Sequence, residues 1–282
     1  TMSKFYDSFR GAYAKARGIT EKKVLPKVYN YYIEQFTKIT KRFLETGSYN
    51  PIGFFQQKFI TDLYAHIYIN TGMYFVLWYA DNFRKYTNKQ INPELYLQEW
   101  EATFKWYSIQ MAEVWGPEIT RTATKSAIRT FEALMKDPEF AMLGVEQKAK
   151  ILSRKHEHIG MVNSKRIITT ETTRISNYAL EQSATTLFDA QYLKKYWIAS
   201  IDGAERSSHN VAHYKYQDGI PMKEKYNVGG EMLDRPGAGY LAENNINCRC
   251  VSVALPVPDA EANVELDSFG FGMAGGKTTN WY

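Results

Sequence analysis

Apolar side chains recur roughly every 3.6 residues along most of the first 190 positions, and this period predicts helices. From Pro51 onward, one helix face would carry apolar residues at a spacing of four: Phe55, Phe59, Leu63 and Ile67. Another helix is predicted from Pro93 onward, and further helices follow over residues 117–136, 145–159 and 161–190. The pattern therefore indicates a largely helical chain up to residue 190.

Proline and glycine set the predicted ends of these helices. A capping side chain precedes a proline at Asn50-Pro51 and Asn92-Pro93, which is typical of a helix start. A short turn of helix is also expected to start at Asp137-Pro138. Glycine and proline disfavour continuation of a helix. We therefore expect helix ends at Gly116-Pro117 and Gly160, and a break near Gly72.

The pattern changes after Ala190. Residues 196–201 are rich in aromatic and β-branched side chains, and residues 250–255 alternate as a strand does. We expect these segments to pair in a small sheet, with a short helix over 206–214 and a turn at Asp218-Gly219. The predicted fold class is α+β: a mostly helical N-terminal region followed by a small mixed domain with short antiparallel strands. The predicted divisions are a helical region (1–160), a long helix with a small α+β unit (161–256) and a flexible glycine-rich tail (257–282).

Aromatic residues make up 15% of the 282 residues, and two interpretations fit this content. The simpler is an aromatic-rich helical core, and the other is a set of aromatic helix faces that dock on partner proteins. The net charge of +5 and the pI of 8.9 allow weak, non-specific and salt-sensitive contact with DNA. The most apolar run, residues 73–80, is far shorter than a bilayer span, so no membrane insertion is expected.

Both cysteines of the chain lie close together, at Cys248 and Cys250. With His209, and with either His213 or Asp202, they could form a tetrahedral zinc site, because thiolate and imidazole are preferred zinc ligands. In the alternative no cofactor is bound, and the cysteines are small buried side chains in a structural clasp. The Cys-x-Cys spacing favours the clasp, since structural zinc sites usually have Cys-x-x-Cys. If the cysteines face His209, a metal is favoured instead.

Asp202, Arg206 and His209 also allow two interpretations. A carboxylate that orients a histidine beside an arginine describes an acid/base or phosphate-binding site. In the structural interpretation, Asp202 caps the following helix, while Arg206 and His209 bind backbone carbonyls. No nucleophile or paired carboxylate accompanies these residues, so we favour the structural interpretation and expect no enzymatic activity.

Charged residues on the long helix and in the cysteine segment are expected to pair. Glu171 and Arg174 are three residues apart, which suits a helical ion pair, although Glu171 could instead reach Arg206 or Arg249. Arg249 is expected on the opposite side of its segment from the cysteines, within reach of Asp202 or Glu171.

Two stretches of the chain carry a resemblance to a known protein family. Residues 246–250 read Ile-Asn-Cys-Arg-Cys, after a region that contains Trp197 and His209. Upstream, Arg166 and the Thr170-Glu171 pair form an Arg-x-x-x-Thr-Glu signature. Together, residues 165–253 resemble the C-terminal domain of the phage head morphogenesis proteins, the Mu F-like minor head proteins.

The resemblance implies a minor head protein of a tailed phage or prophage-like particle, acting in head morphogenesis near the portal and associated with packaged or ejected DNA. It implies the portal and other head proteins as partners, and a place in the virion, in the capsid interior or at the portal vertex, after synthesis in the host cytoplasm. Six residues are assigned to the structural motif: Glu171, Trp197, Asp202, Arg206, Asn247 and Arg249. Because domains of this family are also fused to toxins, the competing hypothesis is an enzyme or toxin-like domain. Its metal- or nucleotide-directed site would lie around five residues: Asp202, Arg206, His209, Cys248 and Cys250.

Overall fold

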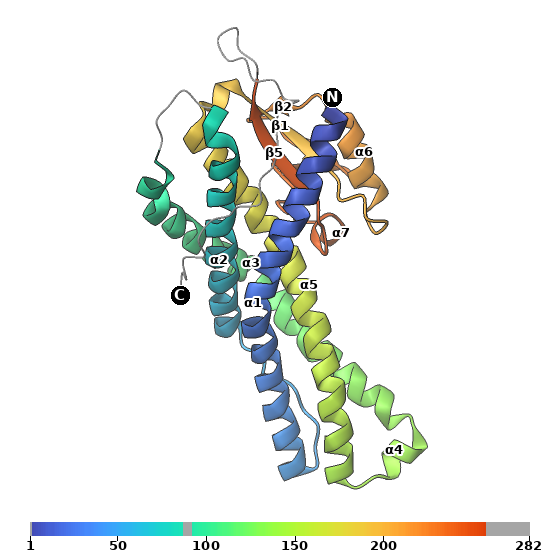
Figure 1. The fold of residues 1–282 in the computed structure, drawn as a ribbon. Helices are drawn as coiled ribbons and strands as arrows, with labels where there is room; N and C mark the ends of the chain where they lie inside the picture. Colours follow the sequence, from blue (N-terminus) through green and yellow to red (C-terminus); the bar gives the residue numbers. More distant parts are fainter. Residues whose placement is uncertain (1, 87–91, 258–282) are drawn as a thin grey trace. The chain divides into compact units, whose positions relative to one another are not determined.

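A computed structural model describes residues 2–86 and 92–257, and long helices make up most of it (Figure 1). The α-helices are α1 (Met2–Thr46), α2 (Gln57–Phe83), α3 (Leu97–Met135), α4 (Pro138–Met142), α5 (Val145–Leu187), α6 (Ser207–Lys215) and α7 (Ala242–Asn245). Short 3-10 helices are η1 (Arg84–Tyr86), η2 (Pro93–Tyr96) and η3 (Ala190–Tyr192). None of the helices in these ranges is both long enough and apolar enough to cross a bilayer. The predicted glycine-rich tail lies, from residue 258 onward, outside the described residues.

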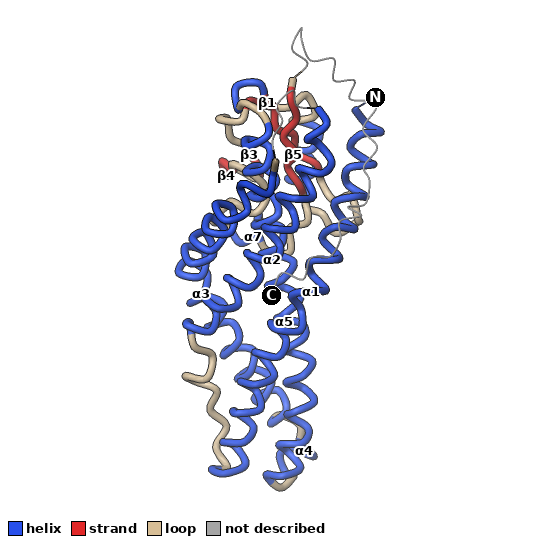
Figure 2. Tube along the Cα trace, turned by 60° about the vertical axis from the view of Figure 1, so that its left-hand side comes forward, coloured by secondary structure: helices blue, strands red, loops and turns tan. Residues whose placement is uncertain are grey.

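The strands are short and form two small antiparallel sheets (Figure 2). They are β1 (Leu193–Ile198), β2 (Ile220–Pro221), β3 (Tyr226–Val228), β4 (Glu231–Leu233) and β5 (Val251–Pro256). β1 lies between β2 and β5, and its register with β5 places Trp197 opposite Ser252. This pairing and the α+β class are as predicted from the sequence. The β3–β4 hairpin was not predicted, although its Gly229-Gly230 turn, with both residues at positive φ, is a recognised hairpin signal.

The predicted helix breaks at glycine are wrong. α2 continues through Gly72, α3 through Gly116-Pro117 and α5 through Gly160. A Cβ on Gly72 would lie 2.5 Å from the Phe104 ring, so this glycine lets α2 and α3 approach closely. Packing of this kind outweighs the cost of about 1 kcal/mol that glycine imposes on a helix.

The three predicted helix starts have different outcomes. Asn92 and Asp137 cap the helical turns that begin at Pro93 and Pro138, as expected. Asn50 instead accepts the N–H of Ile52 within a local turn, and α2 begins only at Gln57. The predicted start at Pro51 is therefore wrong, because an Asn-Pro pair also suits an isolated turn.

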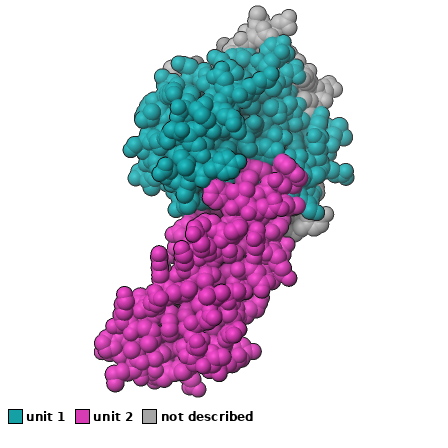
Figure 3. All heavy atoms as spheres, turned by 180° about the vertical axis from the view of Figure 1, so that it is seen from behind, with its two compact units in different colours: residues 1–22, 67–105, 169–282 teal, residues 23–66, 106–168 magenta. Residues whose placement is uncertain are grey.

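The chain forms two compact units, each assembled from separate stretches (Figure 3). Unit 1 comprises residues 1–22, 67–105 and 169–282, and unit 2 comprises residues 23–66 and 106–168. The predicted divisions at 160 and 256 are continuous stretches of sequence, whereas α1, α2, α3 and α5 each contribute residues to both units. The candidate site described below lies wholly within unit 1.

Most aromatic side chains of the described residues are buried. In unit 1, Phe9, Tyr13 and Phe75 are fully enclosed, and the Tyr13 hydroxyl hydrogen-bonds the Ser176 hydroxyl. The aromatic content therefore serves a core. A few aromatic side chains are nevertheless exposed, among them Trp106 on α3 at 60%.

A histidine is buried among hydroxyl and aromatic side chains in unit 2. His156 on α5 has its Nδ1 3.1 Å from the Thr40 hydroxyl and its Nε2 2.8 Å from the Tyr49 hydroxyl, and its ring stacks on Phe36 at 4.4 Å. Burial lowers the pKa of His156 from 6.5 to about 4. The folded state consequently resists protonation of this ring more than the unfolded chain does.

We expect this histidine to make the protein acid-sensitive. Because its folded pKa is the lower one, its stabilising contribution is complete above pH 6.5 and is lost as the pH falls toward 4, by up to about 3 kcal/mol. Urea unfolding at several pH values should show a shallower pH dependence for His156→Phe than for wild type. The control variant His158→Phe, at an exposed position, should show the same pH dependence of the free energy of unfolding as wild type. An equally steep pH dependence for His156→Phe and wild type would contradict this assignment.

Candidate metal centre

A polar face of α5 binds the backbone of the segment that leads into β5. This face carries three buried side chains, Thr170, Thr173 and Asn177. They are three and four residues apart, a spacing that places them on the same side of the helix. The Asn247 N–H donates to the Thr170 hydroxyl at 3.0 Å, and the Thr173 hydroxyl donates to the Cys248 carbonyl. The α5 face thus supplies partners that buried backbone groups require.

Asn177 binds the backbone at two further points of this segment. Its side-chain nitrogen donates to the Cys250 carbonyl at 3.2 Å, and its oxygen accepts the Ser252 N–H at 2.6 Å. The amide thereby imitates the edge of a neighbouring strand. Together with Thr170 and Thr173, it fixes the backbone of residues 247–252, which we call the clasp segment.

A tight turn introduces the clasp segment. The Cys248 N–H donates to the Asn245 carbonyl at 3.1 Å, across Ile246 (φ −63°, ψ 127°) and Asn247 (φ 57°). These angles resemble a type II turn, whose third residue needs a positive φ and is usually glycine or asparagine. The backbone therefore explains the residue type at Asn247.

The two cysteines of the clasp segment face the same imidazole on α6. His209 Nδ1 lies 3.3 Å from Cys250 Sγ and 3.6 Å from Cys248 Sγ. One ligand atom from each of the three residues lies within 4.8 Å of the others, and all three side chains are buried. These residues are close enough together to bind a metal ion.

The two residues predicted as a possible fourth ligand, His213 and Asp202, do not join this group. His213 lies one helical turn beyond His209, but its Nδ1 is 3.1 Å from the Trp197 carbonyl oxygen. Asp202 binds Arg249. Neither residue belongs to the group formed by His209 and the cysteines, so both expectations are wrong.

The thiols are electrostatically coupled to each other and to His209. A hydrogen bond from Cys250 and another from His209 hold the pKa of Cys248 well below its usual value. The pKa of Cys250 is raised, because it shares its hydrogen bond with Cys248 and is buried. The backbone of Cys250 also lowers the pKa of Cys248, and the backbone of Ser200 opposes the rise in the pKa of Cys250. The pKa values of the two thiols are therefore shifted in opposite directions.

An apolar core encloses the group. The Trp197 ring meets His209 edge-on at 5.6 Å and packs against Tyr226 at 5.2 Å. Val228 and Leu233 of the hairpin belong to the same core. Within the described part of the chain, the buried His209 Nε2 and Trp197 Nε1 have no hydrogen-bond partner.

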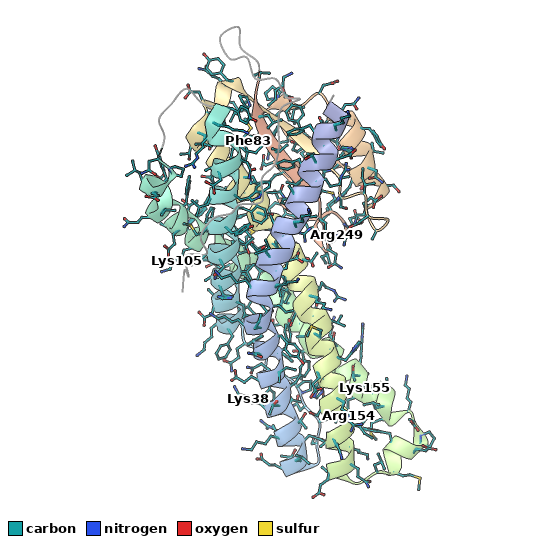
Figure 4. The ribbon with its side chains drawn as sticks, in the orientation of Figure 1. Lys38, Phe83, Lys105, Arg154, Lys155 and Arg249 are labelled. Atoms are coloured by element: carbon teal, nitrogen blue, oxygen red, sulfur yellow. The ribbon has the colours of Figure 1, made fainter. Side chains whose placement is uncertain are left out.

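Arg249, labelled in Figure 4, pairs with Asp202 as one of the two predicted options. Its Nε lies 2.6 Å from one Asp202 oxygen, and a terminal nitrogen lies 2.9 Å from the other. This hydrogen bond lowers the pKa of Asp202. Both side chains are partly exposed, so the pair contributes at most about 1 kcal/mol to the free energy of unfolding.

The prediction that Asp202 caps α6 is wrong, because α6 begins at Ser207 and the capping position is occupied by Arg206.

Glu171 pairs with Arg174 inside the protein. Their ion pair is 2.5 Å long with both side chains buried, and the Tyr68 hydroxyl donates to Glu171 at 2.7 Å. Arg174 Nε also donates to the Gly237 carbonyl at 2.8 Å. The alternative that Glu171 reaches Arg249 or Arg206 is wrong. Arg206 instead donates to the Ile246 carbonyl, in agreement with the prediction that it binds a backbone carbonyl.

The backbone at Gly237, in the loop before the clasp segment, requires a glycine. It has φ +83°, and an added Cβ would lie 2.8 Å from the Arg174 Cα. Only glycine combines this conformation with so close an approach to α5. The loop can therefore reach the buried ion pair.

Sequence reasoning missed two buried asparagines in α7. Asn244 donates to the Val228 carbonyl at 3.2 Å and to Glu231 at 2.8 Å, while the Asn245 oxygen accepts the Gly239 N–H at 3.1 Å. They hold the loop before the clasp segment against the hairpin. Their only sequence signal is an Asn-Asn pair in a loop-like region, which also suits an exposed turn.

Comparisons with family models, with curated proteins and with solved structures gave no match for this chain.

Proposed function

We propose that this chain is a minor head protein of a tailed phage or prophage-like particle and acts in head morphogenesis near the portal. The observation that supports the proposal is the contact between the two stretches that carry the resemblance. Thr170 of the helix signature binds Asn247 of the Ile-Asn-Cys-Arg-Cys stretch, 77 positions away. The two stretches that carry the resemblance are therefore neighbours in the folded protein.

We assign the protein a structural role instead of a catalytic one. His209, Cys248 and Cys250 are exposed by 2% or less, and the Asp202 oxygens accept hydrogen bonds from Arg249. An enzyme or toxin-like activity centred on these side chains would require a substrate to reach them. Burial argues against this competing hypothesis.

The proposed partners are the portal and other head proteins. Exposed apolar side chains of α3, including Trp106 and Val114, offer contact positions on unit 2. DNA contact would be weak and non-specific, because a net charge of +5 supports few phosphate contacts. The proposed cofactor of the His209–cysteine group is zinc, and the proposed location is the virion.

Sedimentation with portal rings tests the partner assignment. The purified chain should co-sediment with portal protein from the same genome, and Trp106→Ser should weaken this binding without changing the far-ultraviolet circular dichroism. Substitution of the exposed Met142 by serine serves as the matched control. Failure of the wild-type chain to bind portal rings or procapsids would contradict the assignment.

A further inference from the structure

The three candidate ligands have the spacing of a coordination sphere. Zinc–sulfur bonds of 2.3 Å and zinc–nitrogen bonds of 2.0 to 2.1 Å at tetrahedral angles place sulfur and nitrogen about 3.5 Å apart. The two observed separations from His209 Nδ1 are 3.3 Å to Cys250 Sγ and 3.6 Å to Cys248 Sγ. One hydrogen on Nδ1 can bond well to only one of these sulfurs. One cation between the three atoms would bind them all.

We propose that His209, Cys248 and Cys250 bind one zinc ion that locks α6 onto the clasp segment. The ion would make the clasp a metal-dependent element of the fold. This proposal gives the zinc proposed above a role in the fold, and it does not depend on the head-protein assignment.

Charge balance suits this ion in a buried site. Two thiolates and a neutral imidazole around a divalent cation have no net charge, and a neutral group is far less costly to bury than an isolated ion. Sulfur and imidazole ligands also select zinc over magnesium and calcium, which prefer oxygen. The surrounding Trp197 and Tyr226 belong to the apolar core, which fits a structural ion.

The protein orients the sulfurs through its own hydrogen bonds. Thr173 and Asn177 bind the carbonyls of Cys248 and Cys250, so both side chains point toward α6. Both sulfurs lie within 3.6 Å of His209 Nδ1 on that helix. Hydrogen bonds to ligand atoms are the usual means by which a protein orients and tunes a metal site.

The three residues leave one tetrahedral position for another ligand. No fourth His, Cys, Asp or Glu belongs to the group among the described residues. We expect a light atom, oxygen or nitrogen, in that position. X-ray absorption of the zinc-loaded chain should therefore show two sulfur and two light scatterers.

Metal content of the purified chain tests the site. We expect one zinc per chain for wild type, and at least a tenfold loss of zinc affinity for His209→Gln. His213→Gln is the matched control, because His213 is a buried histidine on the same helix whose Nδ1 hydrogen-bonds the Trp197 carbonyl, and this variant should keep its zinc. Cobalt loading of wild type provides a second readout, which does not depend on the folding of His209→Gln. Cobalt should give the strong near-ultraviolet absorption of thiolate coordination.

Hydrogen exchange tests the lock. Removal of zinc with a chelator should speed exchange in peptides covering 207–215 and leave peptides from α3 unchanged. The site is overturned if wild type refolded with zinc binds none, or if His209→Gln binds as much zinc as wild type. Unchanged exchange in α6 after chelation would overturn the locking role.

Discussion

Replacement of Arg174 by methionine should lower the free energy of unfolding by about 3–5 kcal/mol, because it leaves the Glu171 carboxylate buried without its partner. The guanidinium also donates to the Gly237 carbonyl, so the loop before the clasp segment would lose its anchor on α5. Urea unfolding at neutral pH measures this loss.

The chain contains a matched control for this substitution. Glu118 and Arg121 form an ion pair with the same spacing on α3, but both side chains are more than half exposed. Arg121→Met should therefore change stability by no more than about 0.5 kcal/mol. The double variant Glu171→Leu with Arg174→Met should recover part of the loss, because no buried charge remains. A loss for Arg174→Met no larger than for Arg121→Met would show that the buried pair does not hold the fold.

Asn177→Leu should destabilise the protein by about 3 kcal/mol. Leucine has a similar volume but leaves the Cys250 carbonyl and the Ser252 N–H buried without their partner, at about 1–3 kcal/mol for each group. Chemical unfolding at neutral pH provides the comparison with wild type.

Asn163 provides the control for this prediction. It is also a buried asparagine of α5, but its side-chain nitrogen has no hydrogen-bond partner among the described residues. Asn163→Leu should therefore be close to neutral. Equal losses for the two variants would mean that α5 does not hold the clasp segment through Asn177.

The sequence predicted the helical and strand content well because that signal is local. The 3.6-residue period revealed the helices, and the alternation after residue 250 revealed the partner of β1. Helix ends were predicted less well. Gly72 and Gly160 look like breaks until their neighbours are known, and each lies against a side chain distant in the sequence, such as Phe104 and Ile33.

The candidate site was only partly predictable. The sequence contained His209 and His213 one turn apart, and nothing local decided which of them faces the cysteines. The choice depends on how α6 is rotated, and His213 is held by the Trp197 carbonyl. The polar face of α5 could not be recognised either, since Thr170 and Asn177 would suit an exposed helix equally well. In the folded protein, residues 247–252 hydrogen-bond both side chains, and Tyr13 of α1 also contacts Asn177.

A quantitative mass-spectrometric inventory of purified particles, made from the genome that encodes this chain, tests the proposed function most directly. The proposal predicts that the chain is present in procapsids and mature heads, at a low and constant number of copies for each portal. Its absence from both kinds of particle, while the chain is made in the same cells, would contradict the proposed function.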